Sequence, residues 1–191
     1  MKKIIVVIFM LTGLSYAAVA QSKFSLGPNA GLGHSWVSNT NNAGFKLAAN
    51  AGLSLVYSAT EHFGIGLDAK YSFEGVKAKG NTGLDLNYFR LPLKAIYFFN
   101  GYGNAFRPKI FAGPSLGFLS SAKSGDTDVK SAFNSSDIGI TAGVGFNYRL
   151  VQNTWFNADL NYLHGLSDVT KGSEVNHNRN IGINVGVNFG L

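Results

Sequence analysis

The chain has 191 residues, contains no cysteine and carries a formal net charge of +6. The lack of cysteine excludes disulfide bonds, a thiolate nucleophile and cysteine-ligated metal sites, and the mild positive charge, without a basic run, predicts no nucleic-acid partner. Charged residues make up 14% of the chain, against about 25% in ordinary soluble domains, which indicates that much of the surface faces something other than water.

The start of the chain has the features of a secretory signal peptide. A lysine pair at 2–3 precedes an apolar run at 4–14, and Ala-Val-Ala at 18–20 forms a small-residue cleavage signal. A membrane anchor is the alternative, but the apolar run is shorter than the ~20 residues of a spanning helix. We therefore predict a signal peptide at 1–20 and one exported domain at 21–191.

Downstream of the predicted signal peptide, large apolar residues alternate with small or polar ones at a period of two, which is typical of β-strands. The alternating segments cover 24–37, 45–57, 63–74, 85–99, 109–119, 137–150, 155–166 and 181–191. No window keeps the i, i+3, i+4, i+7 pattern of an amphipathic helix for long, although 130–135 has room for one turn. The pattern predicts eight strands in an all-β domain.

The connections between these segments tend to alternate in length. Tight connections at 58–61 and 151–154 contrast with long, polar ones at 75–83, 120–136 and 167–178. Outer-membrane barrels show the same alternation, with short turns inside and long loops outside. The connections at 38–42 and 100–107 depart from it, since the first is short for a loop and the second is long for a turn.

The two faces of the predicted strands distinguish a soluble sandwich or barrel from a transmembrane one. In the closing segment, apolar Ile181 and Ile183 alternate with Gly182 and Asn184, and a face in bulk water is expected to carry Lys, Glu and Thr instead. Glycine weakens a strand, but it suits the narrow lumen of an eight-stranded barrel. We therefore expect the apolar face to meet lipid and the following glycines to face the lumen: Gly64, Gly66, Gly113, Gly117, Gly139, Gly143, Gly145, Gly182 and Gly186.

Strand length and number agree with a membrane barrel. The segments reach the ~9–11 residues of a tilted membrane strand, bacterial barrels have even strand numbers, and a sheet in lipid has to close on itself. We predict an eight-stranded antiparallel up-and-down transmembrane β-barrel in which the first strand pairs with the last.

Aromatic residues near the segment ends predict two interfacial girdles. The girdle expected on the periplasmic side comprises Tyr57, Phe63, Tyr97, Phe99, Tyr148, Trp155, Phe156 and Phe189. The girdle expected towards the outer rim comprises Trp36, Phe45, Tyr71, Phe73, Phe89, Phe118 and Tyr162.

Four local motifs resemble one family. They are Tyr-Phe-Arg-Leu-Pro-Leu-Lys at 88–94, Ala-Gly-Pro-Ser-Leu-Gly at 112–117, Tyr-Leu-His-Gly-Leu-Ser-Asp-Val at 162–169, and the closing strand with Phe189. Together they resemble the small outer-membrane barrels of Bacteroidetes, the PorT-like or outer membrane protein beta-barrel domain family. The resemblance implies the fold and the location more than an activity.

The closing strand departs from the pattern of the family in one respect. A typical outer-membrane barrel ends in an aromatic residue that the barrel-assembly machinery recognises, whereas this chain ends in Leu191 with Phe189 two positions earlier. Because the alternation is kept, we expect this strand to remain a partner of that machinery.

Several charged residues fall on the predicted luminal face. A charge in a narrow interior has to be paired or hydrated, and both signs occur, so we expect a salt-bridge network that plugs the lumen. The network is predicted to comprise Asp68, Lys70, Glu74, Arg90, Lys94, Asp137, Arg149 and Asp159, with Lys46 and Lys109 also facing inward. Arg90 and Lys94 are expected to pair with acids such as Asp68 and Asp159. A narrow polar pathway for ions or small solutes is the alternative.

No constellation predicts chemistry strongly. His164, Ser167 and Asp168 contain the residue types of a hydrolase triad, but alternation turns His164 outward to the level of lipid headgroups. The histidines lack metal-ligand spacing, Asp126 and Asp128 fit a solvated loop, and the glycine-rich stretches lack the strand–helix context of nucleotide binding. We predict no catalytic residue, no metal and no cofactor.

The sequence therefore predicts an integral protein of the cell outer membrane with a filled lumen. Its expected role is structural, or surface binding through extracellular loops, and its expected partners are outer-membrane lipid and surface proteins or glycans. The alternatives are an outer-membrane lipid-modifying enzyme, a narrow porin-like channel and a soluble barrel that binds a lipophilic ligand.

Overall fold

The computed structural model describes residues 23–38, 43–78, 83–172 and 175–191, and most of them lie in β-strands. The predicted signal peptide falls outside these residues and stays a prediction. The strands are β1 (Phe24–Val37), β2 (Ala43–Gly44), β3 (Lys46–Ser58), β4 (Phe63–Ala78), β5 (Gly83–Phe98), β6 (Phe106–Ser124), β7 (Thr127–Asp128), β8 (Ser136–Val151), β9 (Thr154–Gly165) and β10 (Asn178–Gly190). One 3₁₀ turn, η2 (Lys130–Ala132), falls where the sequence left room for it. No helix in these ranges is long and apolar enough to cross a membrane.

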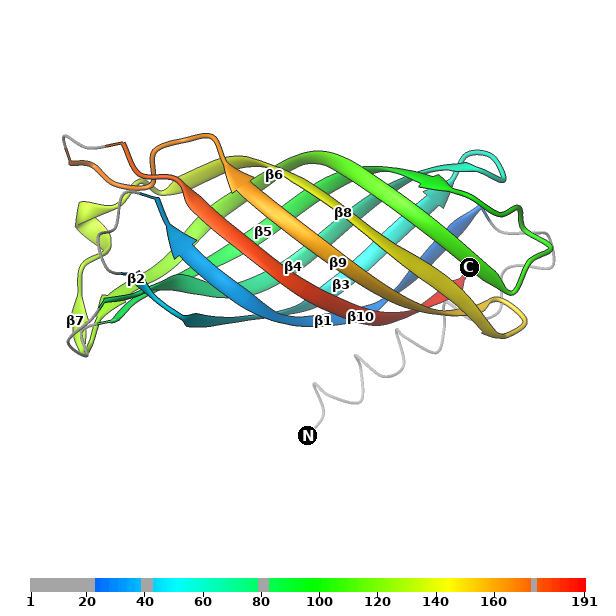
Figure 1. The fold of residues 1–191 in the computed structure, drawn as a ribbon, viewed down its shortest axis with the longest axis horizontal. Helices are drawn as coiled ribbons and strands as arrows, with labels where there is room; N and C mark the ends of the chain where they lie inside the picture. The colour runs from blue at the N-terminus through cyan, green and yellow to red at the C-terminus, as the bar shows by residue number, and fades with distance from the viewer. Residues whose placement is uncertain (1–22, 39–42, 79–82, 173–174) are drawn as a thin grey trace, which may run out of the picture.

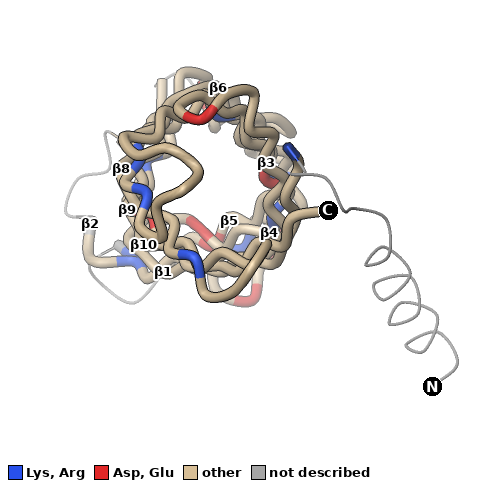
Figure 2. Tube along the Cα trace, turned by 90° about the vertical axis from the view of Figure 1, so that its right-hand side faces the viewer, with Lys and Arg blue, Asp and Glu red and all other residues tan. Residues whose placement is uncertain are grey.

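The long strands form a closed antiparallel cylinder (Figures 1 and 2). Each pairs with its neighbours along the chain, and β1 closes the sheet by pairing with β10 from Ser25↔Gly190 to Val37↔Asn178. The short strands β2 and β7 only extend β4 and β6. The predicted eight-stranded barrel and its first-to-last closure are confirmed.

The two ends of the cylinder differ. The terminal mouth is the end where β1 begins and β10 ends, and it carries the short connections β3–β4, β5–β6 and β8–β9. The loop mouth is the opposite end, with β2, β7, η2 and the remaining connections (Figure 1).

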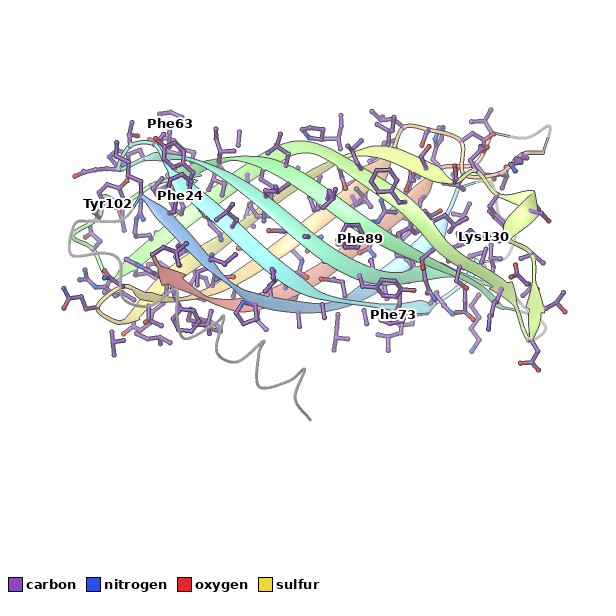
Figure 3. The ribbon with its side chains drawn as sticks, turned by 180° about the vertical axis from the view of Figure 1, so that it is seen from behind. Phe24, Phe63, Phe73, Phe89, Tyr102 and Lys130 are labelled. Carbon is purple, nitrogen blue, oxygen red and sulfur yellow. The ribbon has the colours of Figure 1, made fainter. Side chains whose placement is uncertain are left out.

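The alternating faces point as predicted. Leu32 and Ile183 are 62% and 60% exposed on the outside, whereas Asn180 and Asn188 are buried inside. Phe24 and Phe63 lie near the terminal mouth, and Phe73 and Phe89 lie closer to the loop mouth (Figure 3). An apolar band therefore surrounds the cylinder, with aromatic rings towards both of its edges.

The strands at the loop mouth are longer than the alternation predicted. Within the segment expected to be a loop at 75–83, residues 75–78 and 83 lie in strands, because Glu74↔Leu86 and Val76↔Leu84 continue the pairing of β4 with β5. Gly75 adopts a φ of +128°, a backbone conformation that side chains disfavour. The alternation itself continues, with Val76 buried and Lys77 exposed, but here the buried residue is apolar and the exposed one is charged. The polarity of the two faces is therefore reversed, so the sequence pattern looked like a turn although the hydrogen-bonded ladder continues.

The lumen is not lined only by small and ionic residues, which corrects the sequence-based expectation. Two apolar clusters also face inward. At the loop mouth the cluster contains Val37, Val76, Leu86, Tyr88, Leu119, Ala122 and Val169, with Leu84, Val129 and Phe133 packed against it. Nearer the terminal mouth, Ile96, Phe98 and Phe111 pack with Val56.

Candidate functional site

All but one of the predicted network residues are buried in the lumen: Asp68, Lys70, Glu74, Arg90, Lys94, Asp137 and Asp159. Each comes from a long strand, because the alternation that turns apolar neighbours outward turns these side chains inward. They form two layers at different depths, and Arg149 lies apart from both.

The layer nearer the loop mouth is centred on Arg90. Its Nε and Nη2 atoms donate to the two carboxylate oxygens of Glu74 at 2.5 and 2.6 Å, and Nη2 also donates to Asp137 at 2.7 Å. Ser72 donates to Glu74 at 2.7 Å, and Asn178 donates to the same carboxylate. One guanidinium thus ties β5 to β4 and β8, and the amide of Asn178 adds β10. Fork-shaped pairing of this kind is among the strong charge-assisted interactions in proteins.

The middle layer contains three further ion pairs, of which the longest joins Lys70 Nζ to Asp68 at 3.9 Å. Lys94 Nζ donates to both oxygens of Asp68 at 3.0 and 2.9 Å, and Ser54 donates to Asp68 at 2.8 Å. Lys109 Nζ lies 2.8 Å from an oxygen of Asp159. Lys94 therefore takes a partner that the sequence suggested, whereas Arg90 pairs with Glu74 and Asp137, and Asp159 pairs with Lys109.

A luminal glycine makes the Lys109–Asp159 pair possible. Lys109 on β6 and Asp159 on β9 are separated by β8, where Gly145 is the register partner of both. A Cβ atom at Gly145 would lie 2.2 Å from the Asp159 carboxylate. The bare glycine leaves the space in which the two side chains meet over the intervening strand.

The space left in the lumen differs along its axis. The middle layer encloses a cavity of about 20 Å³, bordered by Asp68, Lys94 and Asp159 among others, and about one water molecule fits such a volume. A cavity of about 600 Å³ opens at the terminal mouth between Tyr102, Trp155 and neighbouring strands. The middle layer therefore separates this vestibule from the loop mouth.

The terminal mouth holds Arg149, which the sequence assigned to the network. Its Nη2 donates to the Gly103 carbonyl at 3.2 Å, and its guanidinium lies 5.7 Å from the Trp155 ring centroid. The strand is irregular here, with a register shift between Arg149 and Val151, so Arg149 reaches the rim rather than the ion pairs. Trp155 also lines this vestibule, which corrects its assignment to the periplasmic girdle on the outside of the barrel.

Arg107 is an inward-facing residue of this mouth that the sequence reasoning missed. It lies 4.1 Å from the ring centroid of Phe98 and donates to the carbonyls of Asn100 and Glu61 at 3.0 and 2.5 Å. It holds the β5–β6 and β3–β4 connections together. The sequence reasoning missed Arg107 because it expected a connection at 100–107, whereas β6 already begins at Phe106.

Two connections fold together over the loop mouth. Phe133 forms a β-bridge with Thr170, and the Asn134 side chain donates to the carbonyls of Asp168 and Thr170 at 2.9 and 3.0 Å. Val169 is fully buried in the apolar cluster beneath. Backbone N–H groups of Asn176 and Thr170 donate to the Asp168 carboxylate and hold its pKa below the ordinary value. We call this unit, formed by residues 125–135 and 166–172 with 175–177, the loop cap.

The hydrolase-like residues do not converge. His164 Nδ1 lies 3.3 Å from the Tyr162 hydroxyl, Ser167 Oγ donates to Asp137 at 3.1 Å, and Asp168 is bound within the loop cap. Across the described ranges, no group of three or more His, Asp or Glu side chains is placed to hold a metal ion.

Comparisons with known proteins give one family and several similar folds. The family model described as "Outer membrane protein beta-barrel domain" matches residues 19–171. Neisserial surface protein A has a similar structure with a TM-score of 0.64 and 19% identity, covering 89% of this chain and 98% of that one. OprG from Pseudomonas aeruginosa has a TM-score of 0.61 and 16% identity, covering 88% and 95%. The outer membrane enzyme PagL has a TM-score of 0.56 and 16% identity, covering 84% and 97%. No curated protein sequence matches.

Proposed function

The chain belongs to the outer membrane protein β-barrel domain family and is located in the outer membrane, and from this premise we propose that it is a barrel with a filled lumen. Its role in the proposal is structural, or surface binding through the loop cap. The terminal mouth then faces the periplasm and the loop mouth faces outward, since short turns lie on the periplasmic side in such barrels.

The closed middle of the lumen is the observation that carries this proposal. Ion pairs from β4, β5, β6 and β9 leave about 20 Å³ between them, and Val169 of the loop cap is buried in the apolar cluster at the loop mouth. Both features favour a rigid anchor over a channel. Loops held on a rigid scaffold are the usual carriers of binding.

Planar-bilayer recordings test the filled lumen. The wild-type protein is expected to give no large, steady conductance. Arg90→Ala removes the cation that joins Glu74 to Asp137 and serves as the comparison, because an opened lumen should conduct more than the wild type. A large, steady wild-type conductance would reject the proposal and favour the narrow porin-like channel.

A loop-cap variant separates the structural role from the surface-binding role. We suggest replacing residues 125–132, which contain β7 and η2, by a short Gly-Ser turn in cells that otherwise lack the protein. Restored detergent resistance with lost adhesion to surface glycans would assign binding to the loop cap. If the variant is folded but the cells stay sensitive to detergent, the loop cap would be assigned a role in membrane integrity.

We include no catalysis in the proposal. PagL is described as an outer membrane enzyme, so the fold accommodates catalysis, but the groups around His164 are turned to different partners. His164→Ala is expected to leave lipid A composition unchanged, and an altered composition would instead support the lipid-modifying alternative.

The proposal also keeps three finer expectations from the sequence. These are membership of the PorT-like group of Bacteroidetes, cleavage of a signal peptide after Ala20, and recognition of the closing strand through Phe189. N-terminal sequencing of the mature protein tests the cleavage, with Gln21 as the expected first residue.

A further inference from the structure

The outer face of the barrel near the loop mouth carries a continuous row of rings. Successive centroids along it are 4.7 to 6.3 Å apart. In order, the row contains Phe45, His34, Trp36, Tyr162, His164 and His177. Aromatic side chains with polar edges favour the boundary between hydrocarbon and headgroups, so this aromatic row is placed at the outer boundary of the membrane.

Arg179 lies within this row and faces outward. On β10 it is the register partner of Trp36 on β1 and of His164 on β9. Its flanking residues Asn178 and Asn180 are buried in the lumen, so the alternation of the strand turns Arg179 to the outside. A cation on this face is surrounded by rings and lipid rather than by luminal acids.

The depth of Arg179 follows from its own strand. The outward apolar positions of β10 run from Ile181 through Ile183 and Val185 to Phe189. Arg179 is the next outward position beyond Ile181, which places its guanidinium at the headgroup level of the outer leaflet. Charges on the lipid face are costly at the midplane and tolerated near the interfaces.

The guanidinium of Arg179 lacks an acceptor within the described ranges. Its Nε atom is buried without a hydrogen-bond partner, and no carboxylate in those ranges forms an ion pair with it. Arg90, by contrast, has two acids. Because a buried donor left unsatisfied is costly, an acceptor from outside the described residues would stabilise the Arg179 side chain.

We propose that Arg179 and the aromatic row bind a phosphate group of a phosphorylated glycolipid in the outer leaflet. The planar guanidinium offers the paired donors that match a phosphate, and its position between rings at the headgroup level matches a lipid rather than a soluble anion. The site goes beyond the proposed anchor role, because it selects lipids by their phosphate.

Trp36 provides a reporter for the test. The chain has two tryptophans, and Trp155→Phe removes the one at the opposite mouth. In this background the folded protein in detergent is titrated with lipid A, with the same lipid after removal of its phosphates, and with inorganic phosphate, while Trp36 emission is followed. Native mass spectrometry counts the lipid that stays bound.

The expected result is phosphate-dependent binding that requires Arg179. Arg179→Gln is expected to weaken lipid A binding by about tenfold, the equivalent of one lost interaction of moderate strength. Arg179→Lys keeps the charge but not the planar fork, so its affinity for lipid A should lie between those of the parent and the Arg179→Gln variant. Arg149→Gln, at the opposite mouth, is the matched control and should bind like the parent.

Other outcomes overturn the proposal. Equal binding of lipid A by the Arg179→Gln variant and the parent would remove Arg179 from the site. Binding of the dephosphorylated lipid as tightly as lipid A would show that the phosphate is not recognised. Displacement of lipid A by inorganic phosphate at similar concentrations would point to a soluble anion as the ligand. Gel mobility without heating shows that each variant is folded, and Arg179→Lys serves as the test if Arg179→Gln does not fold.

Discussion

Arg90 and Asp137 lie on strands separated by β6, yet Arg90 Nη2 donates to Asp137 at 2.7 Å inside the lumen. The residue between them on β6 is Gly117, the register partner of both. A Cβ atom at Gly117 would lie 2.7 Å from Arg90 Nη1. The arrangement repeats that of Lys109 and Asp159 across Gly145, so luminal glycines allow second-neighbour strands to be joined by ion pairs.

Removing the Arg90 guanidinium from this pair should lower the free energy of unfolding. Arg90→Met leaves Glu74 and Asp137 buried without their shared guanidinium, and breaking a buried ion pair from one side typically costs about 3–5 kcal/mol. Urea unfolding of the protein in lipid vesicles measures the free energy of unfolding. Arg149→Met, whose guanidinium lies at the rim, is the control and should change it by less than about 1 kcal/mol. Similar losses in both variants would show that the lumen is better hydrated than inferred.

Filling the gap over β6 should uncouple Arg90 from Asp137. Gly117→Val places a branched side chain between them, and overpacking of this kind costs about 1–3 kcal/mol. The specific prediction concerns the pair: Asp137→Asn should destabilise the wild type more than it destabilises the Gly117→Val variant. A double-mutant cycle measures that difference, which is typically about 0.5–3 kcal/mol for residues in contact.

The matched control for Gly117 is Gly172 in the loop cap. An added Cβ at Gly172 meets no heavy atom within 4 Å, so Gly172→Val should leave the free energy of unfolding nearly unchanged. An additive cycle for Gly117 and Asp137 would mean that the glycine only avoids a local clash and does not serve the ion pair.

Much of the barrel was predictable because one rule, alternation, operates along whole strands. It places Ile183 outside and Asn188 inside, and it also identifies Glu74 and Arg90 as luminal. It does not identify partners, since the pairing of Arg90 with Asp137 depends on strand register and on the glycine between them. Composition alone carries neither piece of information.

The sequence pattern was least informative at the loop mouth. Alternation continues past Gly75, but apolar Val76 is buried and charged Lys77 is exposed, which reverses the polarity of the two faces. Leu86 and Tyr88 keep the parity of Arg90 on β5 and are buried, but they were missed because only small and ionic side chains were expected in the lumen. Arg179 was missed for another reason: its importance comes from the rings beside it on β1 and β9.

The lipid-facing surface should show a depth-dependent tolerance to charge. Val185→Arg places a cation near the middle of the apolar band on β10, where the expected cost is about 2–4 kcal/mol. Ile181→Arg lies at the edge of the same band beside Arg179, where the cost should fall to about 0–1 kcal/mol. Both wild-type side chains are exposed on the outer face, at 44% and 42%, so the pair differs mainly in depth. Unfolding in vesicles should therefore rank Val185→Arg as clearly less stable; equal stabilities would argue against the assigned membrane boundary.

The loop cap should loosen in acid. The pKa of Asp168 is held low by hydrogen bonds from the backbone N–H groups of Asn176 and Thr170, so the folded cap favours the ionised carboxylate. The linkage then has a definite sign: the stabilisation is fully present above the ordinary pKa of a free aspartate, and it is lost as the pH falls through the lower pKa of the folded cap.

Hydrogen exchange of the backbone amides of Asn176 and Thr170 measures this opening as the pH is lowered, after correction for the intrinsic exchange rate. Asp168→Asn removes the titrating group, so it should loosen the cap at neutral pH and abolish the additional acid-dependent opening, while the amides of β9 and β10 stay protected. Acid opening that persists unchanged in Asp168→Asn would assign the effect to another group. Since Asn134 ties the carbonyl of Asp168 to the other half of the cap, the same experiment tells whether both connections open as one unit.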